Sequence, residues 1–163
     1  MTKRIWPQPT KSPLSRGRQI VLVDIENLAG GACISDRAVR SAKEALSGTG
    51  QIGAADHVVI GTSHIGLVHV GSTWDGVRYV VRSGRDGADL ALLDVMAENV
   101  AARFETVVLA SGDGIFADAV SELAAAGVPT TVVGRRGHVA RSLRLAAFQV
   151  IYLDTPTKPR AAA

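Results

Sequence analysis

The stretch Val107-Val108-Leu109-Ala110-Ser111-Gly112-Asp113-Gly114-Ile115-Phe116 contains the pattern that decides the fold. Its apolar beginning predicts a buried strand, its small residues predict a turn, and a helix is expected from there to Ala126. Asp113 then stands at the C-terminal end of a strand. A second apolar run, Gln19–Asp24, ends in a similar way. Functional groups of open α/β sheets gather at the C-terminal ends of strands where the strand order reverses, so we expect Asp24 and Asp113 to lie close together.

The remaining chain alternates between short apolar runs and segments of helical period. Strands are expected at 19–24, 58–60, 77–81, 106–110, 129–133 and 150–153, and helices at 35–46, 64–70, 88–102, 116–126 and 139–147. This alternation predicts one three-layer α/β/α domain, residues 19–154, around a mainly parallel sheet of five to six strands. A flexible basic arm (1–18) and a flexible tail (155–163) are expected to flank it. No glycine-rich dinucleotide or ATP motif follows an expected strand, which disfavours nucleotide cofactors.

The 163 residues carry a formal charge of +3 that conceals an asymmetry. Seven basic residues and no acids lie in 1–18 and 155–163, which leaves 11 basic and 15 acidic residues, a net charge of −4, in 19–154. The basic ends suit nucleic-acid phosphates, although a solvated leader explains them equally well. No apolar run reaches the roughly 20 residues of a membrane span, so no membrane association is expected. A single cysteine, Cys33, excludes an internal disulfide and favours the cytoplasm.

The helix expected at 88–102 supplies a third acidic residue. Asp89 shares one helical face with Leu92 and Met96, so we expect it at the N-terminal end of the buried face. Asp94 lies roughly 140° around the helix from Asp89 and is expected to face solvent. Asp86, in the preceding turn, ranks between these two, because it can either reach the site or cap the helix.

Asp24, Asp89 and Asp113 would repel one another unless they are protonated or bind a hard cation. Because the donors are oxygen atoms, they favour Mg²⁺ or Mn²⁺ over zinc. Such a metal activates water and neutralises charge on a phosphodiester, and Asn27 is expected to orient that water or a phosphate oxygen. Each aspartate also has a plain structural interpretation, as a turn residue, a helix cap or a complement to the helix dipole.

Three segments together suggest a family. They are Val23-Asp24-Ile25-Glu26-Asn27-Leu28, Gly87-Ala88-Asp89-Leu90-Ala91-Leu92 and Ala110-Ser111-Gly112-Asp113-Gly114-Ile115-Phe116. In this order they resemble the motifs of NYN domains, which belong to the PIN-like nuclease superfamily. The resemblance spans about residues 19–153. It implies a PIN-like (Rossmann-like) fold with the first and fourth strands adjacent, and an endoribonuclease that cleaves RNA with Mg²⁺ or Mn²⁺. It also implies that Asp24, Asp89 and Asp113 bind the metal and that Asn27 is the polar residue of the first motif.

One position departs from the family pattern. Many members carry a further aspartate two residues after the one matching Asp113, and this chain has Ile115 there. A second interpretation is therefore a catalytically weak or inactive NYN-fold module that binds RNA or protein. A third, a phosphohydrolase of another Rossmann-like type with Asp24 as nucleophile, needs a lysine near the site. It is disfavoured because Lys43 is the only lysine in the expected domain.

Basic residues near the acidic cluster are candidates for holding substrate. Arg135 and Arg136 follow the fifth expected strand, which places them at the same sheet edge as the acids. Guanidinium groups there would bind phosphates and leave the scissile bond at the metal. Arg85 and Ser111 are further candidates for substrate binding. RNA is the expected partner, and an exposed edge strand could pair two copies in a homodimer.

Overall fold

A computed structural model describes residues 16–31 and 34–153. Six parallel strands form one sheet in the order β3-β2-β1-β4-β5-β6. Their bounds are β1 (Gln19–Asp24), β2 (His57–Thr62), β3 (Arg78–Val81), β4 (Thr106–Ala110), β5 (Thr130–Arg135) and β6 (Gln149–Leu153). The predicted α/β fold is confirmed, and so is the adjacency of the first and fourth strands. The strand order reverses between β1 and β4, and a crevice forms outside their carboxyl ends at such a point.

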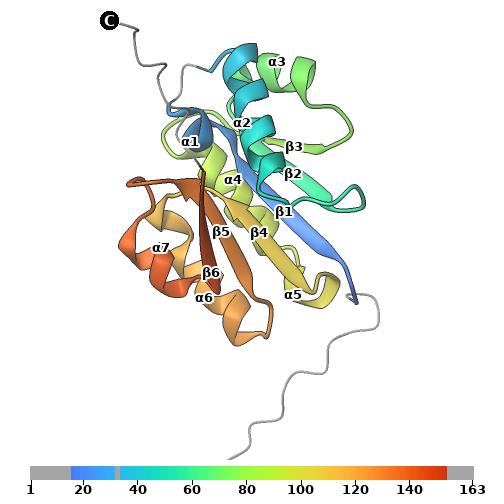
Figure 1. Ribbon diagram of the computed structural model, residues 1–163, viewed down its shortest axis with the longest axis vertical. Coiled ribbons are helices and arrows are strands. Elements are labelled where there is room, and N and C mark those ends of the chain that lie inside the picture. The colour runs from blue at the N-terminus through green and yellow to red at the C-terminus, as the bar shows by residue number, and fades with distance from the viewer. Residues whose placement is uncertain (1–15, 32–33, 154–163) are drawn as a thin grey trace, which may run out of the picture.

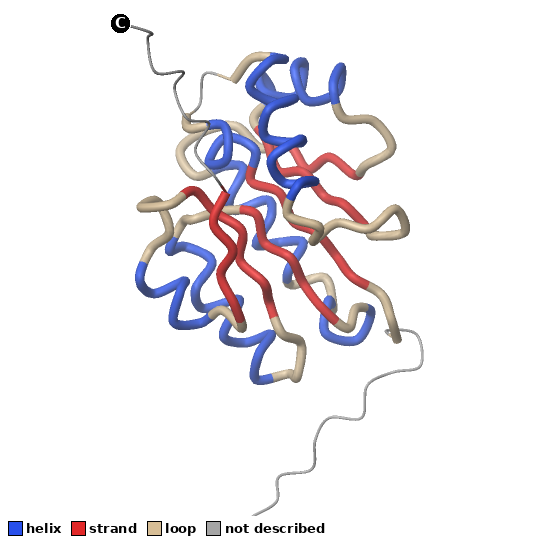
Figure 2. The backbone as a smooth tube through the Cα atoms, viewed as in Figure 1, coloured by secondary structure: helices blue, strands red, loops and turns tan. Residues whose placement is uncertain are grey.

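Helices cover both faces of the sheet (Figures 1 and 2). They are α1 (Ile25–Ala29), α2 (Asp36–Gly48), α3 (His64–Thr73), α4 (Gly87–Met96), α5 (Val100–Arg103), a 3-10 turn (Gly114–Phe116), α6 (Ala117–Ala125) and α7 (Arg141–Ala146). Alternate residues of β1 enter two cores: Ile20 and Leu22 pack with α4, α6 and α7, whereas Val21 and Val23 pack with α1, α2 and α3. Burial on both faces explains why this strand is continuously apolar.

One helix begins where the sequence predicts it, whereas two other helical segments differ from the prediction. Ser35 caps α2, and its Oγ accepts a hydrogen bond from the Ala38 N–H at 3.2 Å. The helix predicted over 88–102 is wrong in its length, because the chain turns at Asn99, with φ of 58°, and separates α4 from α5. Asparagine tolerates this left-handed conformation better than most residues do. No helix was expected before residue 35, but the chain after Asp24 first forms the single turn of α1, which ends at Gly30.

Close packing fixes the elements that border the crevice. Asp24 pairs with Gly61 of β2, and Val23 pairs with Ala110 of β4, so β1 and β4 end at the same edge. A Cβ atom at Gly61 would lie 2.6 Å from Leu92, which shows how closely α4 lies on the sheet. The glycine therefore allows the first turn of α4 to approach the carboxyl ends of the strands.

The predicted arm (1–18) and tail (155–163) lie mostly outside the described residues. Within the described part, the Gly17 N–H donates to the Glu105 carboxylate at 2.7 Å, and the Arg18 guanidinium lies 5.0 Å from the ring centre of Phe104. Residues 17 and 18 are thus attached to the beginning of β4. None of the helices in the described ranges combines the length and apolar character that crossing a membrane requires.

Candidate active site

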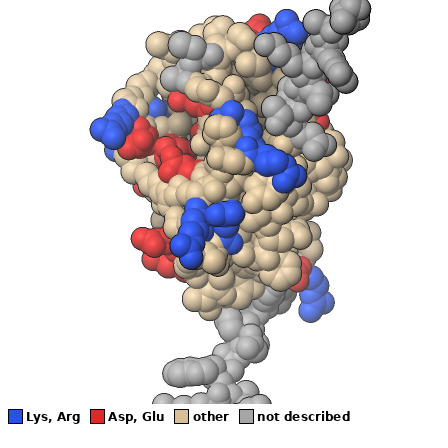
Figure 3. Space-filling view, turned by 60° about the vertical axis from the view of Figure 1, so that its left-hand side comes forward, with Lys and Arg blue, Asp and Glu red and all other residues tan. Residues whose placement is uncertain are grey.

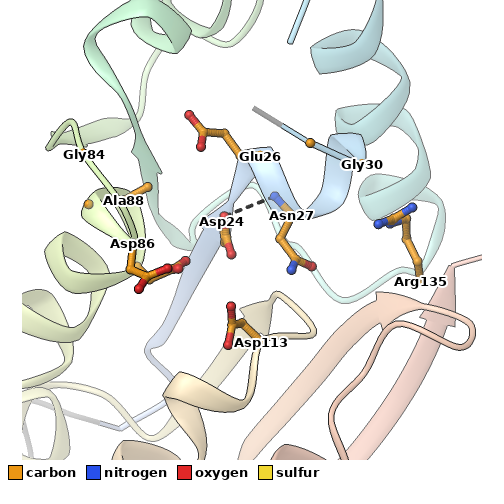
Figure 4. Close-up of a pocket in the computed structure, with 12 residues that line it drawn as sticks. Asp24, Glu26, Asn27, Gly30, Gly84, Asp86, Ala88, Asp113 and Arg135 are labelled. Atoms are coloured by element: carbon orange, nitrogen blue, oxygen red, sulfur yellow. Dashed lines mark hydrogen bonds between the residues drawn. The ribbon is translucent and has the colours of Figure 1, made fainter. Parts of the chain in front are cut away.

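Three elements bring acidic side chains to one cleft at the carboxyl ends of β1 and β4. Asp24 ends β1, Asp113 follows β4, and Asp89 lies in the first turn of α4. The cleft has a volume of about 320 Å³ and is lined by five acidic residues, Asp24, Glu26, Asp86, Asp89 and Asp113. Figure 4 shows the Asp24 and Asp113 side chains directed into the same space. The structure therefore brings together the three aspartates that the sequence singled out.

Asp24 is held rigidly at the floor of the cleft. Its side chain is buried, with 3% of the residue exposed. One carboxylate oxygen accepts from the Asn27 N–H at 3.2 Å and caps α1, and the other accepts from the Ser111 hydroxyl at 2.8 Å. Burial raises the pKa of Asp24, while hydrogen bonds from Asp89, Ser111 and Asn27 oppose that rise. Asp24 therefore both caps α1 and lines the cleft.

Asp89 carries the most perturbed carboxyl group of the cleft. Burial, then repulsion by Asp24 and the hydrogen bond to Asp24, raise the pKa of Asp89 to about 8. Two carboxyl groups form a hydrogen bond only when one of them is protonated. The pKa of Asp89 lies above neutrality, so this carboxyl group holds a proton at pH 7. At neutral pH the pair therefore shares one proton, which neutralises part of the acidic cluster.

The turn after β4 is built to place Asp113. Asp113 is half-buried, and its carboxylate accepts from the Ile115 N–H at 2.9 Å, which caps the following 3-10 turn. Ser111, which is fully buried, donates to Asp24 and accepts from the Asp113 N–H at 3.2 Å. Ser111, considered from sequence as a substrate-binding residue, thus lies beneath the cleft and joins its two sides.

Asn27 also connects the two strands. Its side-chain oxygen accepts from the Gly112 N–H at 2.9 Å, so α1 is attached to the turn that carries Asp113. The hydrogen bond uses the amide oxygen, and Asn27 is also among the residues that line the cleft. Sequence reasoning expected Asn27 to orient water or phosphate, and the structure gives this residue a structural contact in addition.

The candidate arginines occupy different positions. Arg135 is the last residue of β5, not a residue beyond it as predicted. Among the described residues that line the acidic cleft, it is the only basic one. Arg136 is exposed, and its guanidinium lies 4.9 Å from the ring centre of Tyr152, outside the cleft. The Arg85 side chain is 96% exposed and lies 3.9 Å from Asp86. The structure therefore brings Arg135 to the acids but leaves Arg136 and Arg85 outside the cleft lining.

Sequence reasoning gave little weight to two acidic residues that line the cleft. Glu26, which was not a candidate site residue in the sequence, is half-buried and accepts from the Ser63 N–H at 3.3 Å. Asp86 precedes α4 in a left-handed conformation, with φ of 56°, and makes no capping hydrogen bond. Asp94, by contrast, is exposed and lies 3.7 Å from Arg82, as its helical phase predicts. The sequence position of Glu26, two residues after Asp24, could have indicated that it lies near the cleft. The short helix α1, which places it there, was not predicted.

The donor atoms of the cleft fit a hard divalent cation. No group of three or more His, Cys, Asp or Glu side chains within residues 16–31 and 34–153 is arranged to hold a metal ion as it stands. Mg²⁺, however, commonly binds proteins through only one or two carboxylates and completes its shell with water and phosphate. The adjacent carboxyls of Asp24 and Asp89 supply two such groups, and a cation would replace their shared proton.

The charge distribution around the cleft is also uneven. Figure 3 shows acidic side chains gathered in a hollow of the surface, with basic side chains on both sides of it. The remaining negative charge of the cleft would repel phosphate groups. A polyanion can therefore approach this site only with the help of neutralising cations or of the neighbouring arginines.

The comparisons with known proteins agree with this geometry. The NYN domain family matches residues 18–154. Among solved structures, the chain is similar to a protein of unknown function from Vibrio parahaemolyticus, with a TM-score of 0.57 and 18% identity over 89% of this chain and 97% of that one. At this identity the likeness concerns the fold alone. No functionally curated protein matches the sequence. Since the family match covers most of the chain and includes all three acidic segments, the protein belongs to the NYN domain family, whose members are PIN-like and probable nucleases.

Proposed function

We propose that the protein is an endoribonuclease that hydrolyses RNA phosphodiester bonds with Mg²⁺ or Mn²⁺ at the acidic cleft. The observation that carries this proposal is the convergence of Asp24, Asp89 and Asp113 in one cleft at the β1–β4 crevice. Membership of the NYN family supports RNA as the substrate. The single cysteine favours the reducing cytoplasm as its location.

Each residue of the cleft has a role in this proposal. A bound Mg²⁺ or Mn²⁺ would supply a more acidic water and neutralise charge on the scissile phosphate. Asp24, held by Ser111 and the Asn27 N–H, presents a fixed carboxylate to the cation. Asp89 holds a proton at neutral pH, and its carboxylate becomes a ligand once this proton is released. Asp113 adds negative charge on the opposite side, and Arg135 binds a phosphate at the edge of the cleft.

Cleavage of a fluorescently labelled RNA tests the proposal. We expect the wild-type protein to cleave single-stranded RNA with Mn²⁺ or Mg²⁺ and to be inactive in EDTA. The Asp24→Asn and Asp113→Asn variants should lose about a hundredfold or more in rate, because charge stabilisation of the transition state is usually the largest catalytic contribution. Asp94→Asn is the matched control, since Asp94 lies on α4 but is exposed and outside the cleft. Wild-type rates in both cleft variants would rule out this site.

One observation favours a second function. Ile115, which stands where many family members carry a further aspartate, is partly buried and packs against the core beneath α6 and α7. The cleft therefore lacks a carboxylate at this position. The alternative is an NYN-fold module that binds RNA or protein without hydrolysing RNA. RNA binding that persists in Mn²⁺ over many hours without any cleavage product would favour this alternative over the nuclease.

A further inference from the structure

A second cavity lies beside the acidic cleft. We call it the α2 groove; it runs between α2 and the carboxyl ends of β5 and β6 and has a volume of about 300 Å³. Small side chains of α2 form one wall, among them Ala38, Ser41 and Ala45. Leu153 lies on the opposite wall, and Arg136 and His138 border the groove. Its volume is at the lower end of the range of small-ligand pockets, and its walls are mostly apolar with a few polar groups, as in such pockets.

Arg135 connects the α2 groove to the acidic cleft. It lines both cavities, and its guanidinium packs over Gly30, where an added Cβ would lie 3.4 Å from a terminal nitrogen. Figure 4 shows Arg135 on the far side of Asn27 from Asp24. Within the described residues, the buried Nε atom of Arg135 has no hydrogen-bond partner. Because the Nε atom is buried, a phosphate in either cavity would contact the remainder of the guanidinium group, for which phosphate oxygens are well-suited acceptors.

We propose that the α2 groove binds one unstacked base of an RNA strand and that the phosphate beside this base contacts Arg135. This inference rests on the proposed function, because the acidic cleft then holds a neighbouring phosphodiester of the same strand. The order of the cavities matches the chemistry of a polynucleotide: an apolar slot for a flat base, a cation for a phosphate, and then the carboxylates. Arg136 adds a second positive charge at the mouth of the groove.

The proposal has a consequence for the form of the substrate. A base can enter the α2 groove only after leaving its stack, which is easiest in a single strand, a loop or a bulge. Continuous double-stranded RNA would have to extrude a paired nucleotide, so we expect it to bind more weakly. The base also provides affinity that a strand of phosphates alone cannot give.

The test is RNA binding by fluorescence anisotropy in EDTA, where no cleavage takes place. The probes are a short labelled single-stranded RNA, the same RNA in a duplex, and an abasic phosphodiester oligomer of equal length. Ser41→Leu fills the groove from an exposed position of α2. Ser47→Leu is the matched control, because Ser47 is exposed on the same helix and lines a separate hollow with Arg40 and Lys43.

We expect Ser41→Leu to weaken binding of the single-stranded RNA roughly tenfold, which corresponds to about 1.4 kcal/mol, within the range for stacking of one base. Binding of the abasic oligomer should not change, and Ser47→Leu should resemble the wild type with every probe. Ala38→Leu, at another position of the wall, should repeat the effect of Ser41→Leu, and thermal unfolding of each variant verifies its fold.

Two results would overturn the proposal: unchanged RNA affinity in both groove variants, or an equal loss for the RNA and the abasic oligomer. The outcome is separable from that of the nuclease proposal. RNA cleavage that persists in Ser41→Leu with unchanged affinity would refute the base site and leave the nuclease intact. A selective loss of RNA affinity in a protein that never cleaves RNA would support the base site and refute the nuclease.

Discussion

Replacing Asp89 with asparagine is expected to make the metal-free protein more stable at alkaline pH and to change little at acidic pH. The pKa of Asp89 rises from 3.8 to about 8 in the folded protein, because the carboxyl group is partly buried beside Asp24 and Asp113. The folded state therefore binds the proton more tightly than the unfolded state. Between pH 4 and pH 8, the free energy of unfolding contributed by this group must fall as the pH rises.

The size of the effect follows from the shift. A pKa difference of one corresponds to about 1.4 kcal/mol, so the rise from 3.8 to about 8 limits the effect on the free energy of unfolding to about 6 kcal/mol. Asp89 is only half-buried, and solvent screening reduces this value considerably, so we expect about 1–3 kcal/mol. For a domain of this size, such a difference corresponds to roughly 2–12 °C in the unfolding temperature. Asparagine is nearly the same size as aspartate, so the substitution removes the titratable group with little change in volume.

Urea denaturation followed by circular dichroism, in EDTA, measures this difference at pH 5 and at pH 8.5. Groups other than Asp89 titrate in both proteins, so the difference between their pH profiles isolates Asp89. Asp94→Asn, on the exposed side of α4, is the control and should follow the wild-type profile. If the Asp89→Asn and wild-type profiles are parallel from pH 5 to pH 8.5, the carboxyl pair does not share a proton and our account of the cleft is wrong.

Three other results are expected. Ser111→Ala should cost about 1–3 kcal/mol of unfolding free energy in urea denaturation, because the buried Asp24 carboxylate loses a donor; a cost below the experimental error would contradict this. Gly112→Ala should cost about 2–3 kcal/mol of unfolding free energy, since its Cβ would overlap the carbonyl oxygen of His138. Gly48→Ala is the control and should be neutral or stabilising, because the space around Gly48 is open. Equal stabilities of the two variants would show that the backbone around Gly112 shifts to accept the methyl group. Binding of Mn²⁺ should release protons at pH 7 and fewer at pH 9, as measured by calorimetry in buffers of different ionisation enthalpy; pH-independent release would count against a protonated carboxyl in the site.

Much of the fold was predictable because it depends on local patterns. The apolar run of β1 and the Ser35 cap of α2 are complete in the sequence, and both were located within a residue or two. The single turn of α1 was not, because five residues are too few for a helical period, and the turn exists through the Asp24 cap and the left-handed Gly30. The interruption at Asn99 likewise depends on one backbone conformation, which residue type allows but does not specify.

The site was predictable only in part. Strand ends and helical phase were sufficient to bring Asp24, Asp89 and Asp113 to one cleft. The position of Ser111 beneath the cleft was not predictable, because it follows from the pairing of β1 with β4, which only the family resemblance implied. The separation of Arg135 from Arg136 was also missed, since β5 continues to Arg135 and alternate residues of a strand point to opposite faces.

A crystal of the wild-type protein soaked in Mn²⁺ and measured for anomalous scattering tests the central claim most directly. We expect one strong peak in the acidic cleft within coordination distance, about 2.0–2.3 Å, of carboxylate oxygens of Asp24 and Asp89, with Asp113 facing it. The same soak of an Asp24→Asn crystal should lose this peak. An empty cleft at saturating Mn²⁺, or a peak bound elsewhere on the domain, would contradict a metal-dependent nuclease site between β1 and β4.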